Sequence, residues 1–325
     1  MSNAFVDKNY IYAVSRIRYA ELRLLDRSVF DRLCDAADLS ECLSILAEKG
    51  FGGDSRDHED MIAEERRRLW ELMEELVPDS SVFDVFRLQN DYQNLKAAIK
   101  ESAMDQPMPD IYVSDCVVDP ALVREAVSER RYKELPGDLA ETAERCHEIF
   151  LRTRDGQLCD ILVDHDALVA LQKAAEATKD PTLIKYAGLT AASADIKIAV
   201  RAASTGKDET FLDRALAECS ELDIDSLKKA AISGTEAVYA YLANTDFADA
   251  VPKLRESSAA FECWCDDLII RSIKPQLWNS FGLGPLAAYI LAKETELRSV
   301  RILLTARQNG FSADRVRERV RETYV

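Results

Sequence analysis

Residues that interrupt helices are scarce in this sequence: 11 glycines and 9 prolines occur among its 325 residues. Alanine, leucine, glutamate and arginine are plentiful instead, and that composition favours helix along most of the chain. Hydrophobic residues make up 47% and charged residues 31%, which is normal for a folded protein and excludes a disordered one. The length suits two or three domains of roughly 100 to 150 residues. We therefore predict an all-α protein with more than one domain.

The chain also lacks an excess of basic charge, a membrane-length apolar run and paired cysteines. Its net charge is −16, so we expect no nucleic-acid partner, because the field of the protein repels phosphate. The longest apolar run, 281–292, is far shorter than the roughly 20 residues of a transmembrane helix. The eight cysteines form no C-x-x-C pair and no signal peptide opens the chain, which predicts reduced, mostly buried thiols and a cytosolic location.

Three segments of the chain resemble one another and begin roughly one hundred residues apart. They are "LQNDYQNLKAAIK" from Leu88, "LTAASADIKIAVR" from Leu189 and "KETELRSVRILLT" from Lys293. Apolar residues recur at about i, i+4, i+7 and i+11 in each, so each is predicted to be an amphipathic helix. A cation occupies the same place in all three, as Lys96, Lys197 or Arg301. Lys293 does not fit the pattern, because the other two copies have leucine there.

A second helix is predicted after each copy, at 119–127, 208–216 and 312–320. Each begins with a residue that commonly caps helices, namely Asp119, Asp208 or Ser312. A period near one hundred is too long for the common helical solenoids, so it indicates three small helical lobes of one design. We place these lobes at 1–112, 113–215 and 216–325, and we expect the terminal segments to pack together.

Candidate metal sites in the sequence are incomplete. Glu144 and His147 form the single E-x-x-H, whereas a di-iron helical bundle needs two such motifs and two further carboxylates. Asp266 and Asp267 are typical of the start of an aspartate-rich magnesium motif, but Ile270 stands where a third aspartate is needed. Both pairs are better interpreted as solvated helix faces.

Other catalytic patterns are weaker still. Gly206 and Lys207 lack the preceding glycine and the following Ser or Thr of a phosphate-binding loop. Cys146 and His147 are adjacent and would point apart on a helix, and we interpret Asp164, before His165, as a helix cap. We therefore predict no catalytic residue, no metal site and no cofactor.

Two features suggest contacts with a partner instead. The apolar run beginning at Phe281, Gly282 and Leu283 follows a loop, where a short apolar helix could sit against another apolar assembly. Seven arginines lie between residue 298 and the end of this acidic chain, and we select Arg315 and Arg319 as candidates for contact with an acidic partner or headgroups.

Three stretches also carry a family resemblance. They are "NDYQNLKAAIK" at 90–100, "GPLAAYILAKETELRSVRILLTARQNG" at 284–310 and "YAVSRIRYAELRLLDRSVFDRL" near the start. They combine D-x-x-N-L-K, A-Y-x-x-A-K-E-x-E and R-x-x-R, and they resemble the C subunits of bacterial and archaeal V/A-type rotary ATPases, a family that includes the d subunits of eukaryotic vacuolar ATPases. Gly284 departs from the family, which usually carries Glu before this proline.

The resemblance implies three lobes in a pseudo-threefold funnel with a central cavity. Such a subunit would sit on the cytoplasmic end of the membrane proteolipid ring, accept the foot of the central shaft and couple ATP turnover to proton or sodium transport. It would have no active site and no cofactor, would be peripheral to the membrane through the ring, and would be a monomer when isolated. Asn94, Lys96, Lys197 and Arg301 would be structural residues of the repeated cores.

Two alternatives come from other functional classes. An all-helical scaffold with a different protein partner would bind neither proteolipid rings nor shaft subunits. A helical metal-dependent enzyme would contain bound metal.

Overall fold

The structure of the protein, a computed structural model, describes residues 10–53, 57–104, 111–153 and 155–325. Over these residues it is built from helices and contains no strand, which confirms the all-α prediction. Residues 112–118, which precede α7, form neither helix nor strand. Within the same residues, no helix is both long enough and apolar enough to span a bilayer.

Aspartates begin many of the helices. The Asp26 carboxylate accepts a hydrogen bond from Val29 N at 3.0 Å, and Asp119 accepts one from Ala121 N at 2.9 Å. Such a cap satisfies an amide that has no partner within the helix, and each is worth about 1 kcal/mol. The same arrangement occurs at Asp38, Asp57, Asp155, Asp208 and Asp223. Part of the acidic composition therefore serves to fix where helices start.

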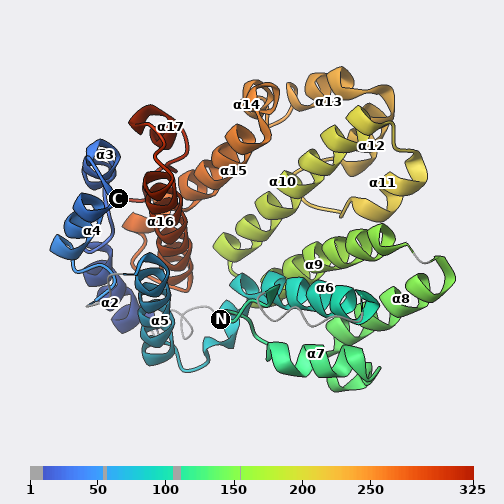
Figure 1. Ribbon diagram of the computed structural model, residues 1–325, viewed down its shortest axis with the longest axis horizontal. Helices are drawn as coiled ribbons and strands as arrows, with labels where there is room; N and C mark the ends of the chain where they lie inside the picture. The colour runs from blue at the N-terminus through green and yellow to red at the C-terminus, as the bar shows by residue number, and fades with distance from the viewer. Residues whose placement is uncertain (1–9, 54–56, 105–110, 154) are drawn as a thin grey trace, which may run out of the picture. The chain divides into compact units, whose positions relative to one another are not determined.

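The chain divides into two compact units, and the first contains both ends of the chain. Unit 1 comprises Met1–Ser80, Asp180–Thr182 and Asp249–Val325. Its helices are α2 (Ile11–Glu21), α3 (Arg27–Asp35), α4 (Leu39–Glu48), α5 (His58–Leu76), α14 (Ala250–Glu256), α15 (Ser258–Ile273), the 3₁₀ helix η5 (Lys274–Trp278), α16 (Gly284–Gln308) and α17 (Ala313–Arg317). Figure 1 shows α16 in dark red, with α2 to α5 in blue beside it.

The core of unit 1 joins residues from the first and last quarters of the sequence. Phe30, Leu33 and Leu46 from α3 and α4 pack with Leu303 and Leu304 of α16, and all five are at most 2% exposed. Burying each such side chain contributes about 1.5–3 kcal/mol, so the two terminal segments stabilise each other. Both segments belong to unit 1, and this shared core connects them within it.

Unit 2 comprises Ser81–Lys179 and Leu183–Ala248. Its helices are η2 (Ser80–Phe86), α6 (Leu88–Met104), α7 (Pro120–Ser128), η4 (Tyr132–Glu134), α8 (Gly137–Thr153), α9 (Gly156–Thr178), α10 (Pro181–Thr205), α11 (Glu209–Ala215), α12 (Ile224–Ser233) and α13 (Thr235–Leu242). The helix α9 packs against α6, α8 and α11 (Figure 1). Leu95, Val123 and Cys146 lie in the core that α6 to α9 form together.

The repeat predicted from the sequence has a structural counterpart. In that alignment Asn94 of α6, Asp195 of α10 and Ser299 of α16 are equivalent, and all three are at most 2% exposed. Each accepts a hydrogen bond from the backbone of a later segment: Val113 N at 2.7 Å, Ala217 N at 3.0 Å and Arg321 N at 3.4 Å. A buried polar group on each repeated helix thus fixes the segment that follows.

The helices that follow the repeated ones agree with the sequence prediction in position. They are α7, α11 and α17. Asp119 and Asp208 cap α7 and α11 as predicted, whereas Ser312 occupies the corresponding place before α17 without making a side-chain cap. The division into lobes 1–112, 113–215 and 216–325 stays a prediction.

Candidate interaction site

The charged motif of α16 forms a buried ion network in unit 1. The Lys293 ammonium lies 2.6 Å from Glu65 of α5 and 2.5 Å from Glu296, one turn further along α16. All three side chains are at most 10% exposed. The residue that did not fit the sequence repeat is therefore the centre of this network.

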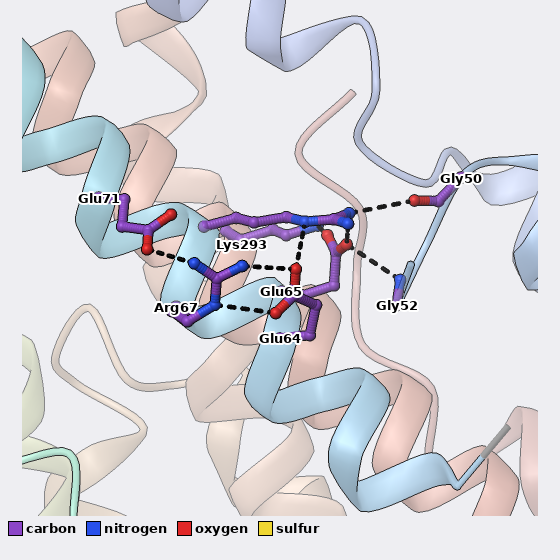
Figure 2. Close-up of polar contacts among 8 residues, drawn as sticks. Gly50, Gly52, Glu64, Glu65, Arg67, Glu71 and Lys293 are labelled. Carbon is purple, nitrogen blue, oxygen red and sulfur yellow. Dashed lines mark hydrogen bonds and ion pairs between the residues drawn. The ribbon is translucent and has the colours of Figure 1, made fainter. Parts of the chain in front are cut away.

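Backbone groups complete the network (Figure 2). Glu65 accepts a hydrogen bond from Gly52 N at 3.0 Å, as Figure 2 shows. Glu296 accepts one from Leu25 N at 2.5 Å. Gly52 has φ +78°, and a Cβ there would lie 2.5 Å from the Met61 side chain, so this turn requires glycine. The network thereby ties α16 to α5, to the turn after α4 and to the loop after α2.

Burial and neighbouring charges shift the pKa values of this network in opposite directions. Burial alone would lower the pKa of Lys293, but Glu296 and Glu65 raise it above its ordinary value, so the ammonium stays charged. Burial raises the pKa of Glu296, although Lys293 and the Leu25 amide oppose this. Glu65 is also 3.0 Å from Arg68, which places a second cation against the Glu65 carboxylate. Removing one member would leave a buried charge without its partner.

A further set of ion pairs extends along the surface of α5 and α16. Arg66 binds Glu294 through two hydrogen bonds of 2.9 Å, and Arg67 pairs with Glu64 at 2.7 Å. Figure 2 shows Arg67 between Glu64 and Glu71 on successive turns of α5. Glu294 and Glu296 of the K-E-x-E sequence therefore both hold α16 in place.

A cleft of about 620 Å³ opens beside this network, between α2, the turn after α4, α5 and α16. Its apolar wall includes Leu24, Leu69 and Leu72, and Lys293 lies over the Phe51 ring, with Nζ 5.0 Å from the ring centre. The other lining side chains with charge are Arg16, Arg23, Lys49, Arg68, Glu48 and Glu65. The cleft is therefore positively charged on a protein that is acidic overall.

Tyr289 is a buried residue of this cleft with a polar group that the ion network does not use. It is 7% exposed, and its hydroxyl has no hydrogen-bond partner within the described ranges. Burial raises the pKa of Tyr289 to about 12, so the hydroxyl keeps its proton and is a donor. Neither Tyr289 nor the cleft could be identified from the sequence, because the walls of the cleft come from segments more than 200 residues apart.

The loop predicted to contact a partner is held in a defined conformation. Arg18 of α2 donates hydrogen bonds to Gln276 O at 2.6 Å and Asn279 O at 2.5 Å. Phe281 is 54% exposed, and Gly282 has φ +76° at the turn into α16, whereas Leu283 is buried. Trp278, which is not among the residues predicted to contact a partner, ends η5 directly before this loop and is 88% exposed.

Most arginines near the C-terminus have internal partners. Arg298 and Arg321 both bind Asp266, and Arg301 binds Glu59 at 2.8 Å. Arg307 donates to Cys34 O and Arg317 pairs with Asp35. Arg315 and Arg319 are exposed, and neither has an ion-pair partner in the described part of the chain. Of the seven, these two stay available to a partner.

The residues predicted to be structural, Asn94, Lys96, Lys197 and Arg301, all have contacts within the described part of the chain. Asn94 donates to Val113 O at 2.9 Å as well as accepting from its amide, and Lys96 pairs with Asp164 of α9. Arg301 joins α16 to α5 through Glu59. Lys197 lies on α10 and also has an interaction partner. Asp164 lies within α9, so our interpretation of it as a helix cap was wrong.

The candidate catalytic groups have structural contacts. Asp266 binds two arginines, and Asp267 accepts a hydrogen bond from Glu322 N at 2.6 Å. His147 lies against the Tyr132 ring, with the ring centres 5.7 Å apart. Over residues 10–53, 57–104, 111–153 and 155–325, no cluster of three or more His, Cys, Asp or Glu side chains could hold a metal ion.

The sequence model of the family described as ATP synthase (C/AC39) subunit matches residues 13–319. The chain belongs to this family. It is therefore a non-catalytic subunit of a V/A-type rotary ATPase, and the family resemblance predicted from its motifs is confirmed.

Relatives of known name agree with this membership. The chain is 22% identical over 317 residues to the C subunit of the V-type sodium ATPase of Enterococcus hirae, covering 95% of this chain and 97% of that protein. It is 23% identical over 328 residues to the C subunit of the V-type ATP synthase of Thermus thermophilus, covering 94% and 96%. The C subunit of the A-type ATP synthase of Methanocaldococcus jannaschii is 20% identical over 349 residues, covering 95% and 85%.

Proposed function

We propose that this protein is the socket of the central stalk, joining the central shaft to the membrane proteolipid ring. In this role it rotates with both and transmits torque between ATP turnover on other subunits and the transport of protons or sodium ions. The observation that carries the proposal is the family match over residues 13–319. The relatives from V-type ATPases and ATP synthases, matched over almost their whole lengths, support the same role.

The proposed architecture is a funnel of three lobes, 1–112, 113–215 and 216–325, around a central cavity. The equivalent buried anchors Asn94, Asp195 and Ser299 support a threefold repeat. Closely packed helices with short capped connections suit a part that must transmit torque without bending. The proposed location is the cytoplasmic face of the membrane, reached through the ring.

Two exposed regions are the proposed contacts with ring and shaft. One is the loop that Arg18 holds, which presents Trp278 and Phe281. The other is formed by Arg315, which lies in α17, and Arg319, which follows that helix. Large aromatic side chains and arginines dominate the binding energy of many interfaces, which makes these residues suitable anchors.

Co-purification from membranes tests the proposal. The tagged full-length chain is incubated with detergent-solubilised membranes of its source that lack the endogenous protein, and captured proteins are identified by mass spectrometry. We expect shaft subunits and the proteolipid to be recovered together. A complex assembled without the chain is expected to hydrolyse ATP while pumping no ions.

The alternatives make different predictions in the same experiment. A helical scaffold with another partner would capture neither shaft nor proteolipid, and the ATPase lacking the chain would pump normally. A metal-dependent enzyme would carry stoichiometric metal in elemental analysis of the purified chain. Either result would contradict the proposed role.

A further inference from the structure

An aromatic and basic stripe runs along the exposed face of α2. Tyr12, Arg16 and Tyr19 lie at the spacing of one helix face, and Arg23 continues the stripe in the turn after α2; the two tyrosines are 63% and 61% exposed. Each arginine lies over the preceding tyrosine, with its guanidinium carbon 5.8 or 5.4 Å from the ring centre. Stacking of this kind presents flat apolar surface and hydrogen-bond donors side by side.

The stripe leads into the cleft of unit 1, because Arg16, Tyr19 and Arg23 also line it. Arg16 already pairs with Glu75 at 2.7 Å, whereas Arg23 and Lys49 make no ion pair within the described residues. Tyr289 adds the buried hydroxyl without a partner. Two cations without a carboxylate and one hydroxyl without an acceptor therefore converge on a cleft that has an apolar wall.

We propose that this cleft and the α2 stripe bind an acidic amphipathic segment of a partner protein. One carboxylate of the segment binds Arg23 and Lys49 at the rim, and an acceptor that enters the cleft binds the Tyr289 hydroxyl. Apolar side chains of the segment pack between Leu24, Leu69 and Leu72. That the partner belongs to the ATPase rests on the proposed function, but the chemistry of the binding site does not.

The shape of the surface favours a peptide segment over a small anion. A nucleotide or phosphate would use the cleft alone, and the exposed Tyr12 of α2, which lies outside it, would have no role. A segment of several residues covers both, and its negative charge complements a basic surface on a chain of net charge −16. The stripe would thereby set the direction in which the segment lies.

Titration of the full-length chain with a labelled synthetic peptide tests the proposal. The probe alternates glutamate and leucine, and its binding is followed by fluorescence anisotropy; a lysine–leucine peptide of equal length is the comparison. We expect the acidic peptide to bind and the basic one to bind at least tenfold more weakly. Equal binding of the two, or none, would overturn the proposal.

Matched variants locate the binding surface. Arg23→Ala with Lys49→Ala should weaken binding of the acidic peptide about 30-fold, and Tyr289→Phe about fivefold, reflecting roughly 1 kcal/mol for each lost charged or polar contact. Lys133→Ala with Arg214→Ala is the control, because it also removes one lysine and one arginine, both exposed and in unit 2. The proposal fails if the control weakens binding as much as the cleft variants do, or if ATP displaces the peptide.

Photo-crosslinking in the assembled ATPase separates this inference from the proposed function. A photoreactive phenylalanine analogue replaces Tyr19, and mass spectrometry identifies the attached segment. A segment with alternating acidic and apolar residues supports the inference, and a basic segment or no crosslink overturns it. If the peptide binds at the cleft but the chain captures no shaft or ring protein from membranes, the proposed function alone fails.

Discussion

Asp195 is expected to destabilise the protein at neutral pH, and Asp195→Asn should remove that effect. The carboxyl is fully buried on α10, and one of its oxygens accepts the Ala217 amide while the other has no hydrogen-bond partner. Burial, opposed by the Ala217 amide and assisted by Glu218, raises the pKa of Asp195 to about 7 from an ordinary value of 3.8. In the repeat, Asn94 occupies the equivalent place and makes the same contact with a neutral side chain.

The direction of the pH effect follows from this raised pKa. The folded protein binds the proton more tightly than the unfolded chain, so the free energy of unfolding is highest below pH 4 and falls as the pH rises to about 7. A difference of about three pKa units corresponds to roughly 4 kcal/mol. We therefore expect Asp195→Asn to raise the free energy of unfolding by about 2–4 kcal/mol at pH 8 and to leave it almost unchanged at pH 4.

Urea unfolding across this pH range measures the effect. Trp70, Trp264 and Trp278 all lie in unit 1, so fluorescence follows that unit, and circular dichroism follows both. The gain should appear in the circular dichroism transition. Asp208→Asn, at the exposed cap of α11, is the matched control and should change little at any pH. A gain independent of pH, or a loss at pH 8, would refute the reasoning.

Three further predictions concern the ion network and the proposed contacts. Lys293→Met leaves Glu65 and Glu296 without the lysine that they share, so it should lower the free energy of unfolding by about 3–5 kcal/mol, measured by tryptophan fluorescence in urea. Adding Glu296→Gln should recover part of this loss. A Lys293→Met variant with unchanged stability would contradict the network. Trp278→Ala should change the free energy of unfolding by less than about 0.5 kcal/mol but weaken the capture of stalk or ring subunits about 30-fold. The control is Ile232→Ala, which alters an exposed apolar residue of unit 2 and should change neither stability nor capture. The affinity of the chain for purified shaft subunits should fall at least about tenfold from low to high salt. The reason is that we expect acidic walls of the proposed funnel to face basic shaft residues. An unchanged affinity would disprove that expectation.

The sequence predicted the features that depend on neighbouring residues. Helix starts at Asp119 and Asp208 could be identified because a cap binds amides two or three positions away. The amphipathic repeats were recognisable for the same reason, since one helix face is encoded within a dozen residues. Ser312 shows the limit of such patterns, because it has the right residue type and position but makes no cap.

Features that depend on distant residues could not be predicted in this way. Lys293 looked like an exception to the repeat because Glu65, its partner on α5, lies more than 200 positions earlier. Five of the C-terminal arginines looked available, but carboxylates and a carbonyl of other segments bind them. Trp278 passed unnoticed since its exposure depends on how Arg18 holds the loop. Contacts between residues that are distant in the sequence, rather than residue type, decide whether these side chains are buried, paired or exposed.

The shared core of unit 1 has a consequence for biosynthesis. The ribosome completes α2 to α5 first, yet Leu303 and Leu304, which cover their apolar faces, emerge among the last residues. Most of unit 2 is a continuous stretch between them and can fold while the early helices wait. A nascent chain stalled before α16 would therefore expose Phe30, Leu33 and Leu46 to chaperones and proteases, so quality control can recognise an unfinished chain before it reaches the complex.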